Sequence, residues 1–310
     1  MIQLMDGIIL IDKPAGPTSA DTVRQVKWRV KPARVGHLGT LDPFATGVLP
    51  ILVGEATKLA PFLHDGEKHY EGLIALGTET DTLDRTGEVV RTAAIASFDS
   101  ARLTAIAASF TGSVTQTPPI FSAIKRGGVP LYKLARRGDE VVPPPSRQVE
   151  IASLDLAVEG VDAIRFRLVC SPGTYVRSLA RDIGLALDGA AHLAELRRTR
   201  SGLFAIGDAH LLEQILAALE CGDASGLIGL RRSVPDLPEV AVDETIAKRL
   251  RNGDSRALDG LIPPQAIPPQ KRFFKVVAHD RLLAIAEATS RMTAVIARIF
   301  GPESAPDVLP

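Results

Sequence analysis

The stretch that decides the fold is GHLGTLDPFATGVLP, residues 36–50. It contains one carboxylate, Asp42, among three glycines and two prolines. Glycine adopts backbone conformations that other residues resist, and it lets a ligand approach the main chain closely. Pro43 fixes its own φ and favours an extended conformation at Asp42. This composition predicts a shaped loop that presents one acid, although an Asp-Pro pair taken alone is also a common turn starter.

The bulk composition is typical of an ordinary globular protein. The chain has 310 residues, 45% hydrophobic and 23% charged, which suggests about two domains. Lys and Arg number 36, as do Asp and Glu, which argues against nonspecific coating of nucleic acid but allows a local basic face. Two isolated cysteines form no disulfide framework, so a reducing cytoplasm is expected. No apolar run approaches the ~20 residues of a membrane span, so no membrane partner is expected.

Hydrophobic periodicity predicts strands and helices on both sides of the loop. Strands are expected at 7–11, 49–53, 69–76, 164–170 and 193–206, and helices at 18–30, 57–63, 99–110, 132–137 and 176–187. A polar loop is expected at 77–87. Beyond a boundary at 235–238, a capped helix at 243–252, a hairpin over 272–287 and a strand at 294–300 predict a small β-rich module.

Three loops hold side chains suited to chemistry: Asp42 in the first, Tyr70 through Asp84 in the second, and Tyr175 with Arg177 in the third. An arginine beside a lone aspartate favours the ionised carboxylate. Since aspartate is already ionised at neutral pH, such a pair would position the acid more than activate it. A tyrosine ring offers a flat surface for a nucleobase, and the competing interpretation is a core tyrosine with a satisfied hydroxyl.

Basic residues gather near each of these loops. The first group lies within 24–34, the second within 125–137 and the third within 197–200. One such cluster is usually a solvated face, but three of them in a neutral protein favour a polyanionic partner. The six histidines lack metal-ligand spacing, and nucleotide-cofactor and serine-hydrolase motifs are absent. No metal and no cofactor are therefore expected.

Together these motifs resemble the bacterial TruB family of tRNA pseudouridine synthases. The matching segments keep their order and spacing over about residues 6–206: KPAGPTS (13–19), GHLGTLDPFATG (36–47), KHY (68–70), TDTLDRTG (80–87), QTPPIFSAIK (116–125), GTYVR (173–177) and AHLAELRR (191–198). The tail, 236–300, resembles a PUA-like RNA-binding module. Leu38 stands where the family commonly has Thr, and Phe121 where it commonly has Tyr.

The resemblance implies an α/β (α+β) pseudouridine synthase fold, with a mixed, largely antiparallel sheet flanked by helices and a small C-terminal β-rich PUA-like domain. The catalytic domain is expected over 1–234, with an insertion at about 116–146, and the PUA-like domain over 235–310. The implied partner is tRNA, bound through its T-arm, with no obligate protein partner. We expect a monomer in the cytoplasm.

The resemblance also implies the reaction, which is isomerisation of uridine 55 in the tRNA T-loop to pseudouridine. The uridine is flipped into a pocket first, at a cost of a few kcal/mol. Asp42 is then the nucleophile, or the group that promotes glycosidic cleavage, and whether it attacks the sugar or the base stays open. Tyr70 stacks on the flipped base, and Arg177 pairs with Asp42.

The resemblance gives further residues supporting roles. Tyr175 and Leu196 line the pocket, His37 fills or stacks near the space that the base vacates, and Asp84 contacts loop nucleotides. Phosphate contacts are expected from a basic set comprising Lys13, Arg24, Lys27, Lys125, Arg197 and Arg198.

Three alternatives compete with this interpretation. A tRNA-binding or folding chaperone on the same scaffold would bind without turnover, and the intact Asp42, Tyr70 and Arg177 argue against that as the sole role. A hydrolase with Asp42 as nucleophile needs a second acid or a metal opposite it, and no motif supplies one. A guide-RNA-dependent pseudouridine synthase shares the catalytic core, and the insertion around 116–146 favours the stand-alone enzyme.

Overall fold

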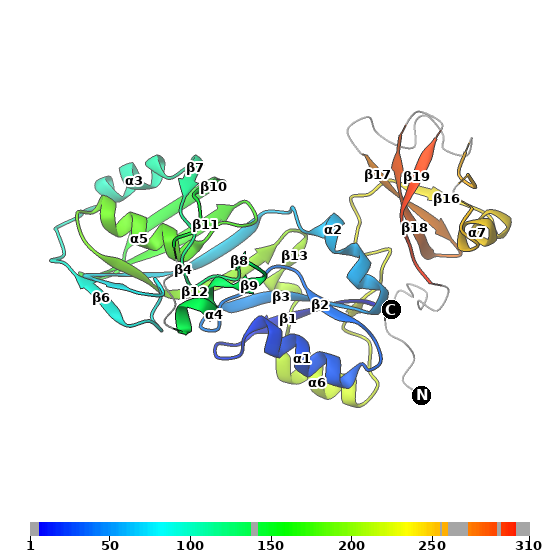
Figure 1. Ribbon diagram of the computed structural model, residues 1–310, viewed down its shortest axis with the longest axis horizontal. Coiled ribbons are helices and arrows are strands. Elements are labelled where there is room, and N and C mark those ends of the chain that lie inside the picture. The colour runs from blue at the N-terminus through cyan, green and yellow to red at the C-terminus, as the bar shows by residue number, and fades with distance from the viewer. Residues whose placement is uncertain (1–5, 138–141, 255, 260–271, 290–292, 302–310) are drawn as a thin grey trace.

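A computed structural model describes residues 6–137, 142–254, 256–259, 272–289 and 293–301. Its central feature is an eleven-stranded sheet (Figure 1). The strands on the main path of the sheet are β1 (Gly7–Lys13), β3 (Thr46–Val53), β4 (Lys68–Leu76), β7 (Gly112–Gln116), β10 (Arg147–Val158), β11 (Ala163–Cys170), β12 (Ala191–Ser201) and β14 (His210–Leu211). Three short strands pair alongside them: β2 (Val35–His37), β13 (Phe204–Ala205) and β15 (Leu227–Ile228).

The main path runs in the order β14-β1-β3-β12-β4-β11-β10-β7. The pairs β1–β14 and β3–β12 are parallel, whereas the other pairs of this sheet are antiparallel. The mixed, largely antiparallel sheet expected from the sequence is confirmed. Its central strand β4 carries Tyr70, which pairs with Leu168 on β11 and with Arg198 on β12.

Helices flank the two halves of the sheet (Figure 1). They are α1 (Ser19–Arg29), α3 (Ser100–Ser109), α5 (Val176–Ala186) and α6 (Leu212–Glu220). Three helices lie elsewhere: α2 (Ala60–Leu63) directly follows the 3₁₀ turn η1 (Gly54–Leu59), α4 (Leu131–Arg136) lies in the insertion, and α7 (Glu244–Arg251) packs in the C-terminal module. A second 3₁₀ turn is η2 (Ile206–Asp208). Thr18 caps α1 in a reciprocal capping box with Asp21, which satisfies donors that a helix start otherwise leaves open. α1 packs beside α6, and both contribute to the main core together with α3 and α5.

The C-terminal β module forms a separate four-stranded sheet in the order β16 (Glu239–Ala241), β17 (Phe273–Ala278), β18 (Arg281–Ala288) and β19 (Ala294–Ile299). The predicted hairpin and last strand are confirmed. This sheet rests on η1 and α2, because Phe273 packs edge-on against Phe62 at 5.1 Å between ring centroids. Lys58 Nζ also donates to the carbonyl of Ile299 at 2.8 Å. The expected domain 235–310 extends over residues outside the described ranges.

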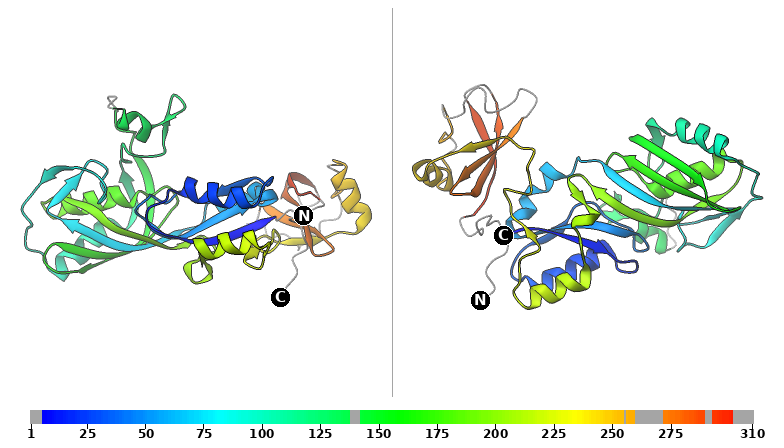
Figure 2. Two further views of the ribbon diagram at one scale, coloured as in Figure 1. Left: turned by 90° about the horizontal axis from the view of Figure 1, so that it is seen from below. Right: turned by 180° about the vertical axis from the view of Figure 1, so that it is seen from behind.

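Two small hairpins project from the body of the sheet. One joins β5 (Thr78–Thr80) to β6 (Val89–Thr92), and the other joins β8 (Lys125–Arg126) to β9 (Val129–Pro130) beside α4. The second hairpin and α4 form the projecting part of the insertion (Figure 2). The polar loop expected at 77–87 begins with a short strand, because Thr78–Thr80 pairs with 89–92, with a bulge between Glu79 and Thr80.

Leu38, one of the two departures from the family pattern, is a core residue. It is 3% exposed, and it belongs to a second core that includes Ile8, Leu10, Val48 and Leu52. Its side chain therefore anchors the start of the Asp42 loop in this core, where an aliphatic group suits its surroundings better than a hydroxyl would.

This burial predicts the effect of restoring the common family residue. Leu38→Thr removes buried methyl groups and introduces a hydroxyl into an apolar core, so it should lower the free energy of unfolding by about 1–3 kcal/mol. Denaturant unfolding measures this, with Thr40→Ala as the control, because Thr40 is exposed in the same loop and should change stability by less than ~0.5 kcal/mol. Equal stability of Leu38→Thr and wild type would contradict the packing role.

Candidate active site

The Asp42 loop spans the connection between β2 and β3, and it is anchored to α1. β2 pairs antiparallel with β3, from Val35–Val53 to His37–Ile51, so the loop proper is shorter than the sequence predicted. Ser19 Oγ accepts from the Leu41 amide at 2.8 Å and donates to the Leu41 carbonyl at 3.0 Å. The residue before Asp42 is thus fixed to the first turn of a helix.

Lys13 holds the same loop from inside. Its Nζ donates to the carbonyls of Pro14 and Ala45 at 2.8 Å and of Pro43 at 3.3 Å. Burial lowers the pKa of this ammonium to about 8, while the Asp42 carboxylate partly opposes the shift. All three ammonium hydrogens have acceptors, and the residue is fully buried. Lys13 therefore shapes the loop around Asp42, and the expectation that it contacts RNA phosphates does not fit its burial.

Arg177, in the first turn of α5, pairs with Asp42 as expected. Its Nη2 donates to Asp42 Oδ1 at 3.2 Å, and its Nε lies 2.8 Å from Oδ2 as an ion-pair contact without hydrogen-bond alignment. Two loop carbonyls complete its surroundings: Nη1 donates to Thr82 at 2.8 Å and Nη2 to Phe121 at 2.9 Å. One guanidinium therefore connects all three loops singled out in the sequence.

Asp84 lies inside this network instead of at the surface. It is 4% exposed, and its Oδ2 lies 3.6 Å from Arg177 Nη1. Oδ1 accepts from the Thr82 hydroxyl and the Thr86 amide, both at 2.9 Å. The expected contact with RNA loop nucleotides does not fit, because the carboxylate is buried and engaged. Asp84 is a second anion that fixes Arg177 from the side opposite Asp42.

The exposures of the two paired side chains differ. The Arg177 side chain is 5% exposed, whereas that of Asp42 keeps 31%. Burial raises the pKa of Asp42, the Arg177 cation opposes this, and the Asp84 carboxylate adds to the rise. The arrangement thus presents a partly open carboxylate, supported by a buried cation, to any molecule that enters from solvent.

Tyr70 lies near the start of β4, within electrostatic range of the Asp42 carboxylate. It is partly buried and packs on the edge of the main core. Burial raises the pKa of its hydroxyl, with the Asp42 charge as a further contribution and the Arg198 guanidinium opposing. The hydroxyl therefore stays neutral at physiological pH. An aromatic ring beside a carboxylate suits the stacking of a base.

Tyr175 and Leu196 occupy neighbouring elements. Tyr175 precedes α5, where the Gln116 side chain accepts from its amide at 2.7 Å and donates to its carbonyl at 3.0 Å. The Arg147 guanidinium lies 4.8 Å from its ring centroid. Leu196 on β12 is 8% exposed within the main core. Gln116 and Arg147 were not among the predicted site residues, since only the register of β7 and β10 brings them here.

His37 sits at the end of β2 with a ring nitrogen that has no protein partner. Its Nδ1 is buried and unbonded, although the residue as a whole is partly exposed. Burial and the nearby Arg198 cation lower the pKa of this imidazole, so the ring is neutral at pH 7. A neutral ring next to the Asp42 loop is compatible with the stacking role expected from the resemblance.

Apart from Lys13, which is described above, five basic residues were expected to contact phosphates, and they differ in their exposure. Arg24, Lys27 and Lys125 are exposed, so they remain available to a polyanion. Arg197 pairs with Asp12 at 2.8 Å and its side chain is 38% exposed. Arg198 is 1% exposed and donates to the carbonyls of Val48 at 2.9 Å and Gly39 at 3.0 Å. Its expected phosphate contact does not fit, since this guanidinium ties β12 to β3 and the Asp42 loop.

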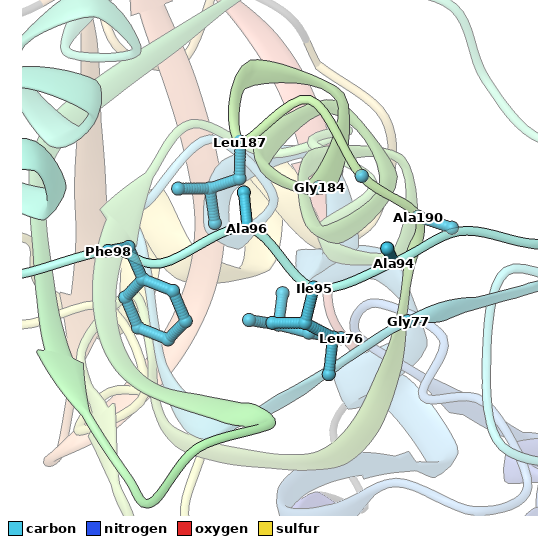
Figure 3. A pocket seen from close by; sticks show the side chains of 10 residues that line it. Leu76, Gly77, Ala94, Ile95, Ala96, Phe98, Gly184, Leu187 and Ala190 are labelled. Atoms are coloured by element: carbon cyan, nitrogen blue, oxygen red, sulfur yellow. The ribbon is translucent and has the colours of Figure 1, made fainter.

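Other features of the described residues supply no chemistry. They contain no cluster of three or more metal-ligating side chains. None of the helices in the described part of the chain is long and apolar enough to cross a membrane. A hollow between Leu76, the segment 94–98 and the end of α5 is lined only by glycines and apolar side chains (Figure 3).

Comparisons with known proteins agree with this site. Residues 27–176 match the model of the TruB family pseudouridylate synthase N-terminal domain, and residues 177–237 match that of the tRNA pseudouridylate synthase B C-terminal domain. The fold and the site therefore define a pseudouridylate synthase. The two matches cover more than half of the chain, and the chain belongs to the TruB family.

Individual relatives support the assignment. The chain is 44% identical to tRNA pseudouridine synthase B of Geobacter sulfurreducens, over 80% of this chain and 82% of the relative. It is 42% identical to the protein of that name from Streptococcus thermophilus, over 92% and 95%. Among solved structures, one titled a Cbf5-Nop10-Gar1 complex has a chain that matches with a TM-score of 0.71 and 26% identity, over 97% of this chain and 86% of that one.

Proposed function

We propose that this protein converts uridine 55 in the T-loop of tRNA to pseudouridine. The observation that carries the proposal is the Asp42–Arg177 pair, in which a buried cation holds a partly open carboxylate within electrostatic range of Tyr70. The named relatives are tRNA pseudouridine synthases B, and the motifs around these three residues are those of that family. The substrate class and the reaction follow from this combination.

The reaction is balanced within the nucleotide itself. The N1–C1′ glycosidic bond breaks, the uracil turns in its pocket, and a C5–C1′ bond forms. C5 loses a proton and N1 gains one, so no net oxidation or group transfer occurs and no cofactor is consumed. Asp42 promotes cleavage as a nucleophile at the sugar or the base. Tyr70 stacks on the uracil while it turns, and Arg177 holds the carboxylate in place.

Binding to tRNA uses the exposed cations. Arg24, Lys27 and Lys125 contact phosphates of the T-arm and its surroundings, which makes the affinity fall with rising salt. Tyr175 and Leu196 line the pocket for the flipped nucleotide. We assign the catalytic domain to 1–234 and the RNA-binding C-terminal domain to 235–310, and the enzyme acts as a cytoplasmic monomer without an obligate protein partner.

The test is to incubate unmodified transcribed tRNA with the purified protein and to map pseudouridine at single-nucleotide resolution. One new pseudouridine at position 55 is expected. A transcript with cytidine at position 55 is the matched control and should gain none. Modification at another position, or none at all in the absence of a guide RNA, would refute the proposed specificity.

A further inference from the structure

The single tryptophan of the chain, Trp28, lies on the surface. It is 66% exposed near the end of α1, where burial would normally remove such a large apolar ring from water. The Arg29 guanidinium lies 5.7 Å from its ring centroid. Arg29 is itself held, by Glu220 on α6 at 2.6 Å and by the Gln25 carbonyl at 3.2 Å. The indole is thus supported by a fixed cation and remains open to solvent.

Trp28 stands within an exposed cationic surface. We define the α1 surface as the exposed residues Arg24, Lys27, Trp28, Lys31 and Arg34. Positions 24, 27 and 28 follow the spacing that places side chains on one helix face, and Lys31 and Arg34 follow shortly after the end of the helix. Asp21 is the one acid between residues 19 and 35, and it is engaged in capping α1 and pairing with Arg24. Among the residues that the structure describes, Lys27, Lys31 and Arg34 have no acidic partner.

This surface is rigidly connected to the Asp42 loop. α1 begins at Ser19, whose hydroxyl bonds both main-chain groups of Leu41. Trp28 lies nine residues further along, about 14 Å at the helical rise per residue. In the left view of Figure 2, α1 and the projecting insertion lie toward the same edge of the molecule, while α6 lies toward the other. An RNA bound at Asp42 can therefore reach both α1 and the projecting insertion.

From this juxtaposition we infer that Trp28 stacks on an unpaired base of the substrate RNA outside the nucleotide that reacts, while the α1 surface binds the adjoining phosphates. Cations attract any polyanion, but an open indole among them suits an RNA loop, because every base has a face that stacks on an aromatic ring. The inference rests on the proposed function, since it extends the contact between enzyme and tRNA beyond the pocket. In this role Trp28 is a positioning residue, which orients the RNA without touching the nucleotide that reacts.

The sequence provides a direct probe, because Trp28 is the only tryptophan. Indole fluorescence of the Asp42→Asn variant, which we expect to bind without turnover, is titrated with unmodified full-length tRNA. We expect a saturable change of emission with full-length tRNA. We also expect Trp28→Ala to raise KM for full-length tRNA by about five-fold or more, from the usual contribution of base stacking, with kcat unchanged.

Two variants separate stacking from structure. Trp28→Phe keeps a ring and should restore most of the affinity, whereas Val161→Ala, at a position 85% exposed in the β10–β11 turn, should change nothing. Thermal unfolding checks that Trp28→Ala is folded. Unaltered indole emission at saturating tRNA, or an unaltered KM for Trp28→Ala, overturns the inference.

The outcome also separates this inference from the proposed function. Fluorescence needs no turnover, so a protein that makes no pseudouridine but shows the emission change would refute the activity and leave the α1 surface as an RNA site. A protein that modifies uridine 55 but shows no change of Trp28 emission with tRNA would support the proposed activity and refute the role of Trp28.

Discussion

Asp42→Asn is expected to abolish pseudouridine formation, lowering the rate by a factor on the order of 10⁴ to 10⁶, as removal of an essential nucleophile does in other enzymes. The substitution keeps the size of the side chain, and an amide oxygen can still accept from Arg177 Nη2, which lies 3.2 Å from Oδ1. The loop should therefore keep its shape while losing the negative charge and the nucleophilicity. Single-turnover rates with saturating enzyme measure the loss directly.

Binding provides the control for this variant. Asp42→Asn should bind tRNA about as tightly as wild type, because the exposed cations that we propose to contact phosphates are other residues, Arg24, Lys27 and Lys125. Asp65→Asn is the matched substitution, since the Asp65 side chain is 99% exposed, and it should retain full activity. An active Asp42→Asn enzyme would show that the carboxylate does not carry the chemistry.

Arg177→Met should produce the second large effect, on stability as well as activity. Arg177 is buried between Asp42 and Asp84, and removing one partner of a buried ion pair typically costs about 3–5 kcal/mol. Arg177→Lys should recover part of the stability and a small, measurable fraction of the activity, since an ammonium cannot reproduce contacts with both carboxylates and with the Thr82 and Phe121 carbonyls. Denaturant unfolding and single-turnover rates compare the three proteins.

The same cation sets the acid limit of the reaction. Asp42 acts in its ionised form, and burial raises its pKa while Arg177 lowers it. Activity should therefore fall as the pH drops through a pKa above that of an ordinary aspartate. Weakening the cation in Arg177→Lys removes part of the opposing contribution, so the acid limb should move to higher pH. An acid limb at the same pH in both enzymes would contradict a direct effect of Arg177 on Asp42.

Much of the fold follows from local sequence. The strands around 7–11, 69–76 and 164–170 and the helix beginning at Ser19 are confirmed, because strongly periodic apolar residues and a clear cap specify them. The strand β10 and the helix α6 were not predicted. β10 has exposed residues on much of its length, and it is a strand because β7 and β11 pair with it. A short segment of sequence does not show that distant strands will pair with it.

The sequence predicted which types of residue form the site, but it did not predict how these residues are buried and arranged. Gly- and Pro-rich loops with an isolated acid and an arginine singled out Asp42 and Arg177, and the structure brings them into contact. The burial of Lys13, Asp84 and Arg198 could not be predicted, since polar side chains that face inward have the same local sequence as those that face water. Only the tertiary structure shows that these three charges are buried and hold the loops.

The most direct test of the central claim follows the hydrogen on C5 of the target uridine. Forming the C5–C1′ bond expels this hydrogen, so tRNA carrying tritium at C5 of its uridines should release one equivalent of tritium per tRNA with the wild-type enzyme. We predict that this release requires Asp42 and a uridine at position 55. No release by the wild type, or equal release from a transcript with cytidine at that position, would contradict it.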